Sequence, residues 1–272
     1  MQKRHVMWVC LLATVSAAAW TAAPQAGQAT QDDWCRSERS RGDQETACEV
    51  RDFTLLPGAA SLAVDAAPNG GITVTGGGRG DILARAKIVA RAQTEARARE
   101  IMAAVRVDAA PDKVSADGPR DLARRESWHV SYDLAVPTQT SLSLTSTNGG
   151  INVRDVEGRI EFKTVNGGVK LSGLAGEVSG RTSNGGVDVE LDGPTWRGTG
   201  LDVETSNGGV RLRIPEQYSA RLETGTVNGG FNIDFPVTVQ GRMDREISVD
   251  LGAGGPLIRV RTGNGGVRVT RK

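Results

Sequence analysis

The chain has 272 residues and carries 33 Lys and Arg against 32 Asp and Glu, so its net charge is close to zero. A balanced, mixed charge argues against nucleic acid or an anionic lipid surface as the main partner, because basic groups in excess hold both of these. With only 2 His in the chain, the composition is also a poor match for catalysis by a nucleophile paired with a His base.

Residues 1–29 have the pattern of a secretory signal peptide. Two basic residues precede an apolar run over residues 6–20, and small residues follow. We expect cleavage after Ala29, with Ala23 and Ala26 as nearby alternatives. The apolar run is shorter than the ~20 residues that a membrane-spanning helix needs, and no later stretch is apolar enough to cross a membrane. The sequence therefore predicts an exported protein, periplasmic or secreted, with no transmembrane segment in its mature chain.

The segment over residues 30–48 contains the two cysteines of the mature chain, Cys35 and Cys48. In an exported protein, two cysteines this close are most simply a disulfide that closes a short loop. Such a loop stabilises the fold by about 3 kcal/mol in the chain-entropy model. A metal site would need further His or Cys ligands that this segment does not offer.

An N-terminal β region with one helix is predicted over residues 49–137. Residues 82–91 and 128–136 alternate apolar and polar side chains, which is the period of a strand. Between them, Thr94 caps a helix over about residues 94–105. If the repeats that follow stack into a solenoid, its open ends must be protected from edge-to-edge pairing. We therefore expect this helix near the N-terminal end of the stack or along one flank. Its apolar residues, which recur at helical spacing, are Ala98, Ile101, Met102 and Val105.

The chain repeats the tripeptide Asn-Gly-Gly. A first copy stands at Asn69, and the later copies are 18, 18, 23, 21 and 36 residues apart. A fixed period of this order is typical of repeat architectures, and we interpret the last interval as two units of 18. The copies in the repeat region, residues 138–272, begin at Asn148, Asn166, Asn184, Asn207, Asn228 and Asn264.

Every copy shows the same alternation around its corner. The third and fifth residues after the Asn are apolar and the residue between them is polar, as in a strand with one buried face. The residue two before the Asn is Ser or Thr in every copy from Asn148 on. Each unit is therefore predicted to be a strand, an Asn-Gly-Gly corner and a second strand, because glycine accepts unusual φ angles and lets backbones approach closely.

Two folds compete for this pattern. Asn-Gly between alternating strands is a strong hairpin signal and predicts an antiparallel β-meander. The other fold is a β-solenoid, in which rungs of about 18 residues stack with like residue above like. Identical columns favour stacking, because a buried Asn column can hydrogen-bond from rung to rung. Alternating charges at one outward position, Lys170, Asp188 and Arg211, agree with it. We predict an all-β solenoid, with the meander as the alternative.

No group of side chains indicates a catalytic site. His129, the one histidine after the signal peptide, lies on the polar face of a predicted strand, where we expect it to be solvated. β-Helical glycosidases use clustered carboxylates, whereas each outward acid here is interleaved with Lys, Arg or Asn. The Gly-rich run over residues 76–81 lacks the spacing of a phosphate-binding loop. We expect no catalytic residue, no cofactor and no metal.

Trp196 and Arg197 lie in the insertion over residues 193–200, which stretches one repeat interval to 23. Insertions in solenoids map to loops on one face, often the binding face, and exposed aromatic side chains suit carbohydrate or peptide ligands. These two residues form the candidate contact loop. The alternative is that the ring of Trp196 folds back over the edge of its rung.

The repeat pattern T-x-N-G-G-V-x-V/L and the run over residues 252–262 resemble a bacterial domain-of-unknown-function family labelled "putative adhesin". The order of a Cys pair, strands, a helix and then repeats strengthens this resemblance, which covers roughly residues 49–272. It implies a β-solenoid in an exported or envelope-associated protein, and it transfers no catalytic residue.

These observations lead to three functional hypotheses. The first is a non-enzymatic, exported β-solenoid that acts as a binding or scaffold surface in the bacterial cell envelope, with an envelope protein or a glycan as its partner. The second is a β-helical carbohydrate-active enzyme, which clustered carboxylates in a groove would indicate. The third is a structural envelope protein that self-associates through its solenoid ends.

Overall fold

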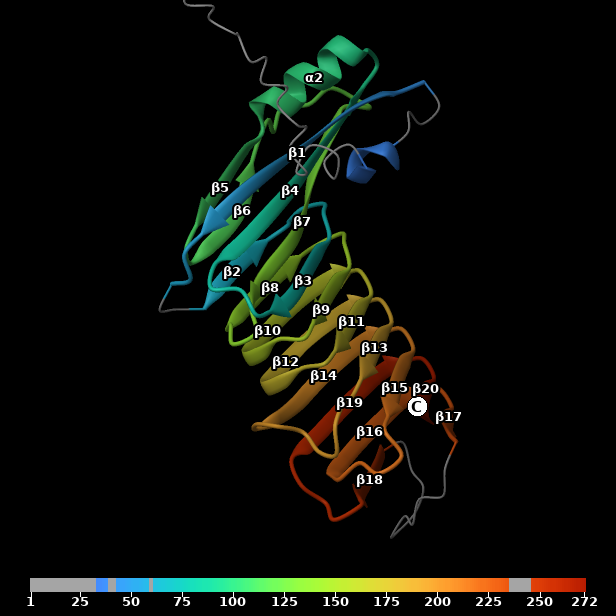
Figure 1. Ribbon diagram of the computed structural model, residues 1–272. Helices are drawn as coiled ribbons and strands as arrows, with labels where there is room; N and C mark the ends of the chain where they lie inside the picture. The colour runs from blue at the N-terminus through green and yellow to red at the C-terminus, as the bar shows by residue number, and fades with distance from the viewer. Residues whose placement is uncertain (1–32, 39–42, 59–60, 235–245) are drawn as a thin grey trace, which may run out of the picture.

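The computed structural model describes residues 33–38, 43–58, 61–234 and 246–272. The expected signal peptide, residues 1–29, lies outside the described residues, so export stays a prediction. Strands form two ten-stranded sheets (Figure 1). Sheet 1 has the order β1-β4-β7-β3-β9-β11-β13-β15-β20-β17, and sheet 2 has the order β18-β16-β19-β14-β12-β10-β8-β2-β6-β5.

The elements run as follows in chain order. They are β1 (Glu45–Leu55), β2 (Leu62–Asp65), β3 (Ile72–Gly77), β4 (Ile82–Ala92), α2 (Glu95–Ala104), β5 (Arg106–Ala110), β6 (Lys113–Asp117), β7 (Ser127–Pro137), β8 (Leu142–Ser146), β9 (Ile151–Arg154), β10 (Glu157–Asn166), β11 (Val169–Ser172), β12 (Ala175–Asn184), β13 (Val187–Glu190), β14 (Gly200–Asn207), β15 (Val210–Ile214), β16 (Ala220–Asn228), β17 (Phe231–Ile233), β18 (Glu246–Leu251), β19 (Leu257–Asn264) and β20 (Val267–Arg271).

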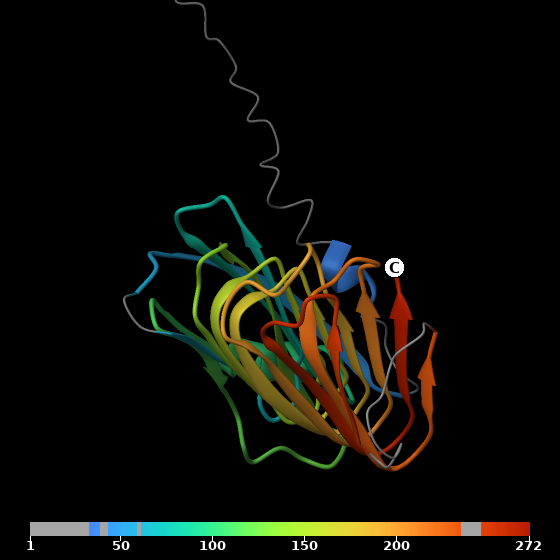
Figure 2. The same ribbon diagram turned by 90° about the horizontal axis from the view of Figure 1, so that it is seen from below.

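The repeat region is a stack of two-strand rungs. In each rung a strand of sheet 2 leads into the Asn-Gly-Gly corner and a strand of sheet 1 follows, as β10 and β11 do. Neighbouring rungs pair in parallel with like beside like, so that Thr164 lies beside Thr182 and Asn166 beside Asn184. Because the corner carries the chain from one sheet to the other, it closes no hairpin, and the antiparallel meander is wrong. Seen from below, the rungs lie one behind another, each offset from the one before it (Figure 2).

The inward columns fill the space between the two sheets. Val169 and Leu171 of one rung and Val187 of the next are at most 2 % exposed. They share one continuous core with inward residues of sheet 2 such as Ile160 and Val178. Full burial of a side chain of this size stabilises the fold by ~1.5–3 kcal/mol. The alternation read from the sequence therefore provides much of the stability of the stack.

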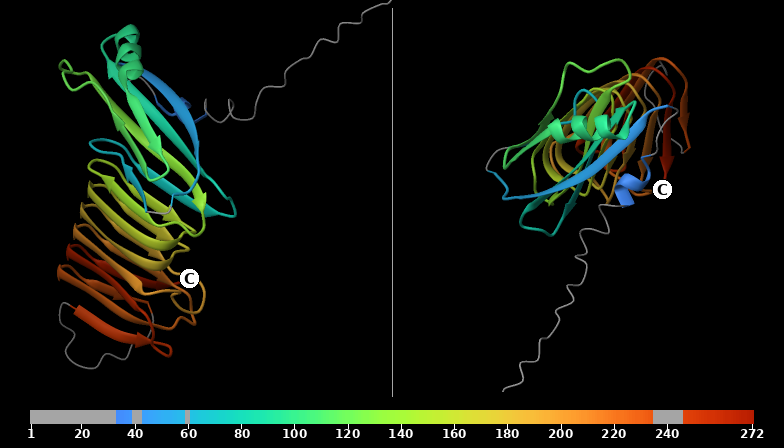
Figure 3. Two further views of the ribbon diagram at one scale, coloured as in Figure 1. Left: turned by 90° about the vertical axis from the view of Figure 1, so that its left-hand side faces the viewer. Right: turned by 90° about the horizontal axis from the view of Figure 1, so that it is seen from above.

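Long antiparallel strands and a helix close the N-terminal end. The strands β1, β4 and β7 are each 11 residues long, and β4 pairs with both of the others. The helix α2 lies across this end, opposite the C-terminal rungs (Figure 3). Its residues Ala98 and Ile101 pack against Ala47 and Ala90, and its N-cap Thr94 accepts a first-turn backbone hydrogen bond at 3.3 Å. The helix therefore covers the N-terminal end of the stack, where β2 and β3 form the first rung.

The last two rungs do not follow chain order. The C-terminal rung of β19 and β20 lies between the rung of β14 and β15 and the rung of β16 and β17. The expectation that the final 36-residue interval holds two stacked units is therefore wrong. After β17 the chain forms β18, which pairs antiparallel with β16 at the edge of sheet 2. The chain then returns and inserts its last rung between two earlier ones.

Candidate binding groove

A buried hydroxyl group holds each corner to its neighbour. The Ser or Thr two residues before the Asn donates a hydrogen bond to the carbonyl oxygen of the first corner glycine in the adjacent rung, at 2.7–2.9 Å. Leaving a buried acceptor without its donor costs about 1–3 kcal/mol, which explains why this column contains only hydroxyl side chains. In spatial order the donors are Ser146, Thr164, Thr182, Thr205, Thr262 and Thr226.

The corner asparagines form an unbroken ladder. Each Nδ2 donates to the Oδ1 of the neighbouring Asn at 2.7–3.0 Å. All of these side chains are exposed, so the expected buried column is wrong, because the Asn lies on the outside of the corner where the chain passes between sheets. In spatial order the ladder is Asn69, Asn148, Asn166, Asn184, Asn207, Asn264 and Asn228.

The two glycines of each corner differ in how much space surrounds them. A Cβ on the first glycine would lie about 2 Å from a backbone oxygen of the adjacent rung, as between Gly167 and the carbonyl oxygen of Gly149. A Cβ on the second glycine meets nothing closer than 3.4–3.6 Å at Gly168, Gly186 and Gly266. No second glycine has a left-handed φ. Rung-to-rung packing therefore requires the first glycine and does not require the second in these three rungs. At Gly71 and Gly150 the space is tighter, because a Cβ would lie 3.3 Å and 3.1 Å from the carbonyl oxygen of the next rung.

A groove of about 980 Å³ runs along the stack over the second glycines. It crosses seven rungs, and we call it the corner groove. The other residues that matter for its chemistry are the first outward side chains after the glycines. The second glycines are Gly71, Gly150, Gly168, Gly186, Gly209, Gly266 and Gly230, and the outward side chains are Thr73, Asn152, Lys170, Asp188, Arg211, Arg268 and Asn232, both in spatial order.

Cations outnumber acids along the corner groove. Its one carboxylate, Asp188, is held by Arg211 at 3.3 Å and by Arg213 at 3.2 Å. In the described part of the chain, no acidic side chain lies within 4.0 Å of the charged nitrogens of Lys170 or Arg268. Insertion of the C-terminal rung also places Arg268 directly beside Arg211. Like charges at neighbouring positions repel, so this stretch of the groove favours an anion.

Trp196, the aromatic residue of the candidate contact loop, is buried and cannot contact a ligand. The Trp196 side chain is only 5 % exposed, and its Nε1 donates to the carbonyl oxygen of Gly176 at 2.9 Å. Gly198 has a positive φ, and its Cα lies so close to Gly176 that a Cβ would clash, so the insertion folds tightly onto the rung beside it. The alternative, with the ring folded back over the rung, is correct. Arg197 stays exposed and lies 3.6 Å from Glu157.

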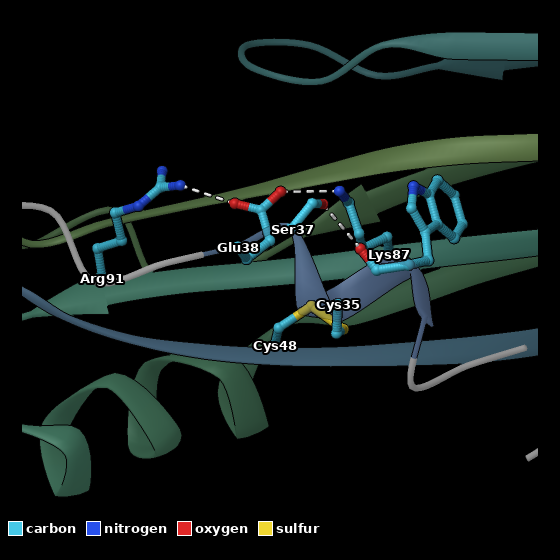
Figure 4. The surroundings of a disulfide bond; sticks show 7 residues. Cys35, Ser37, Glu38, Cys48, Lys87 and Arg91 are labelled. Carbon is cyan, nitrogen blue, oxygen red and sulfur yellow. Dashed lines mark hydrogen bonds and ion pairs between the residues drawn. A yellow bond between two sulfur atoms is a disulfide. The ribbon is translucent and has the colours of Figure 1, made fainter. Parts of the chain in front are cut away.

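Cys35 and Cys48 form a disulfide that joins a short helical stretch, residues 33–36, to β1 (Figure 4). The sequence predicts only one helix, over about residues 94–105, so this second helical stretch is an addition. Glu38 accepts hydrogen bonds from Lys87 at 2.8 Å and from Arg91 at 2.9 Å, both on β4. Burial opposes the charge on Glu38, but the Lys87 hydrogen bond and the charges of Lys87 and Arg91 together lower its pKa. The hydrogen bonds of Glu38 to Lys87 and Arg91 therefore hold residues 33–38 against sheet 1.

His129 on β7 belongs to the same neighbourhood and is half-buried, not solvated as expected. Burial is the main cause that lowers its pKa, and the charge of Arg91 adds to it. Within the described ranges, no three His, Cys, Asp or Glu side chains gather as metal ligands. The same ranges contain no helix long and apolar enough to cross a membrane.

The fold and the groove can be set beside known proteins. No curated protein matches the chain. Among solved structures, a putative cell adhesion protein from Clostridium sporogenes ATCC 15579 is 11% identical, with 83% of this chain and 100% of that chain covered and a TM-score of 0.49. A putative adhesin from Bacteroides fragilis NCTC 9343 is 10% identical, with coverages of 83% and 97% and a TM-score of 0.34. A putative lipid binding protein from Parabacteroides distasonis ATCC 8503 is 10% identical, with coverages of 85% and 98% and a TM-score of 0.31.

With identities of 10–11% and TM-scores below 0.5, these structures give no basis for an argument about function. A family model is more informative, because it matches more than half of the chain. The model described as Toastrack DUF4097 matches residues 127–270, which begin at β7 and include the rungs from β8 and β9 onward. The chain therefore belongs to the Toastrack DUF4097 family.

Proposed function

We propose that the protein is a non-enzymatic, exported binding protein of the bacterial cell envelope, and that the corner groove holds an elongated partner. The observation that carries this proposal is the second glycine of each corner. Glycine in extended structure is less stable than alanine by roughly 0.5–1 kcal/mol. At Gly168, Gly186 and Gly266 a Cβ would make only ordinary contacts, yet the position is glycine in all seven rungs. A glycine in a strand context marks close approach by a ligand or another backbone, and at Gly168, Gly186 and Gly266 the neighbouring backbone is too far away to require one.

The carboxylates support binding over hydrolysis. A glycosidase needs two carboxyl groups that flank the scissile bond. Among the residues that line the groove, Asp188 is the one that carries a carboxylate. That carboxylate is engaged by Arg211 and Arg213, so it is poorly placed to accept or donate a proton. The opposite face, on sheet 2, has a smaller hollow of about 380 Å³ that is lined by Glu161, Asp202 and Glu204. Of these acids, Glu161 pairs with Arg159 and Asp202 pairs with Arg259.

The Cys35–Cys48 disulfide supports an oxidising compartment, because structural disulfides persist outside the cytoplasm. The leader pattern over residues 1–29 agrees with it. Two of the structural neighbours are named a putative cell adhesion protein and a putative adhesin, and both are too distant to add weight.

Co-sedimentation with insoluble envelope material from the source cell tests the proposal. The variant with Gly168→Leu and Gly186→Leu fills the groove with side chains where space allows them. Ser179→Leu is the control, because it adds a Leu to the outer face of sheet 2 in the rung that contains Gly186. We expect the wild type and the control to sediment with the envelope and the filled-groove variant to stay in the supernatant. Thermal melting checks that all three are folded.

Two results would overturn the proposal. If the filled-groove variant sediments as well as the wild type, the groove is not the site. If the wild type itself does not sediment, the binding function fails, and release of reducing sugar from the same material would then favour the carbohydrate-active enzyme.

A further inference from the structure

We propose that the corner groove takes an acidic, linear polysaccharide that lies along the solenoid axis. This inference rests on the proposed function and names the class of ligand. It is carried by three features of the groove: its length, its uncompensated cations, and the kinds of polar group along it.

The length favours an extended occupant. The groove crosses seven rungs at right angles to the strands. Parallel strands lie ~4.8 Å apart, so the groove is about 29 Å long. Its lining repeats from rung to rung, with a glycine and then one outward side chain. A chain of repeating units matches such a surface better than a compact small molecule does.

The charges favour an acidic occupant. Lys170, Arg211 and Arg268 line the groove together with a single acid, Asp188. Asp188 forms ion pairs with Arg211 and Arg213. It lies beside Lys170 in register without forming an ion pair with it, and Arg268 is one strand further away. Arg211 and Arg268 are neighbours in register, and their mutual repulsion would be relieved by an anionic group bound between them.

The remaining groups favour a polysaccharide over a peptide. Extended peptides are bound at a free strand edge or through pockets for apolar side chains. The groove crosses strands that are paired on both sides, and Val169, Val187 and Val210 along it are at most 2 % exposed, so they offer no pockets. Sugar hydroxyls need groups that both donate and accept hydrogen bonds, and amides do this. Such amides are supplied by Asn152 and Asn232 within the groove and by the exposed Asn ladder at the same corner.

Calorimetric titration with an oligogalacturonate long enough to span the groove tests this assignment. We expect binding by the mature protein that weakens as salt is added, because salt screens exposed charges. The variant with Arg211→Gln and Arg268→Gln should lose affinity by about tenfold or more, since it removes the groups that make charge-assisted hydrogen bonds to an anionic ligand. The matched control is Lys163→Gln with Arg181→Gln, which removes two exposed cations from the outer face of sheet 2. Its affinity should equal that of the wild type.

The outcomes separate this inference from the proposed function. If poly-L-glutamate binds as tightly as oligogalacturonate with the same dependence on Arg211 and Arg268, the polysaccharide assignment is wrong. If oligogalacturonate does not bind while sedimentation with envelope still depends on an open groove, the acidic ligand is wrong and the binding function stands. If the control variant loses as much affinity as the groove variant, binding reflects overall charge and the groove assignment is overturned.

Discussion

The two glycines of each Asn-Gly-Gly corner are subject to different physical constraints. The first glycine approaches the adjacent rung so closely that a Cβ at Gly167 would lie 2.0 Å from the carbonyl oxygen of Gly149. The carbonyl oxygen of Gly167 in turn accepts the hydrogen bond from Thr182 at 2.9 Å. The second glycine, Gly168, has its nearest such contact at 3.5 Å. One position is therefore set by packing, and the other is open to a role in binding.

Substituting alanine at the two positions should give very different stabilities. Gly167→Ala forces two rungs apart and should lower the free energy of unfolding by about 3 kcal/mol or more, in the range of severe steric mutations. Gly168→Ala should change it by less than about 1 kcal/mol, as a substitution without a clash does. Urea denaturation of both variants measures the difference. Equal losses would show that the second glycine is also structural, and the argument for the groove would fail.

At the scale of elements, the segment over residues 33–38 depends on Glu38 as well as on the disulfide. The carboxylate of Glu38 is 16 % exposed and is shared by Lys87 and Arg91. The ring of Trp34 lies over the same strand, with its centroid 5.2 Å from Nζ of Lys87. Cations and an aromatic ring at this distance attract each other, so the segment adds an electrostatic attachment to the covalent one.

Glu38→Gln should destabilise the protein in a way that depends on pH. The folded pKa of Glu38 lies below its ordinary value of 4.5, so its contribution is complete above that pH and is lost as the pH falls through the lowered pKa. At pH 7 we expect a loss of about 1.5–3 kcal/mol, the range for a hydrogen bond to a charged group. The difference from wild type should shrink below pH 4.5. Denaturation curves from pH 7 downward measure it.

Asp33→Asn is the control for this experiment, because the Asp33–Arg36 pair is exposed. Such a pair contributes only about 0–1 kcal/mol, so this variant should behave like the wild type. A loss for Glu38→Gln that stays constant down to low pH would contradict the assignment of the effect to the charge.

For the whole molecule, the outward charges on sheet 2 favour the observed order of the last rungs. Every rung from Asn148 on offers a hydroxyl and an Asn at its corner, so these columns fit either order. In chain order Asp202 would lie beside Glu223, and the two acids would repel. In the observed order Arg259 lies between them and binds Asp202 at 3.1 Å and Glu223 at 2.9 Å. The stack gains two ion pairs here, although it also brings Arg211 beside Arg268.

Cysteine pairs distinguish the two orders. In the observed order, Arg211→Cys and Arg268→Cys are neighbours in register, with Cα atoms ~4.8 Å apart, which a disulfide can span. Arg211→Cys and Asn232→Cys are separated by β20 and lie about twice as far apart, beyond the reach of a disulfide. We therefore expect oxidation to cross-link the first pair and not the second, as read by peptide mapping under non-reducing conditions. Cross-linking of only the second pair would establish chain order.

Much of the fold could be predicted from residues alone. The period-2 columns around each Asn predicted strands with one buried face, and residues such as Val169 and Leu171 lie in the core. The helix capped at Thr94 and the Cys35–Cys48 disulfide are present. The burial of Trp196 could not be predicted, because an insertion in the repeat shows where a loop lies and not which way a side chain in that loop points. The groove itself had one signal in the sequence, the second glycine that follows every Asn-Gly.

The sequence by itself determined the rung, because local alternation, the hydroxyl column and the corner glycines each act within one unit or between two identical ones. Only the tertiary structure decided what the rungs do together. It showed which rung lies next to which, that the Asn ladder faces solvent, and that Arg268 from the C-terminus joins Arg211 in one groove. The physical reason is the repetition itself. Units with the same pairing groups can stack in more than one order, and the choice depends on long-range contacts between side chains that differ from rung to rung.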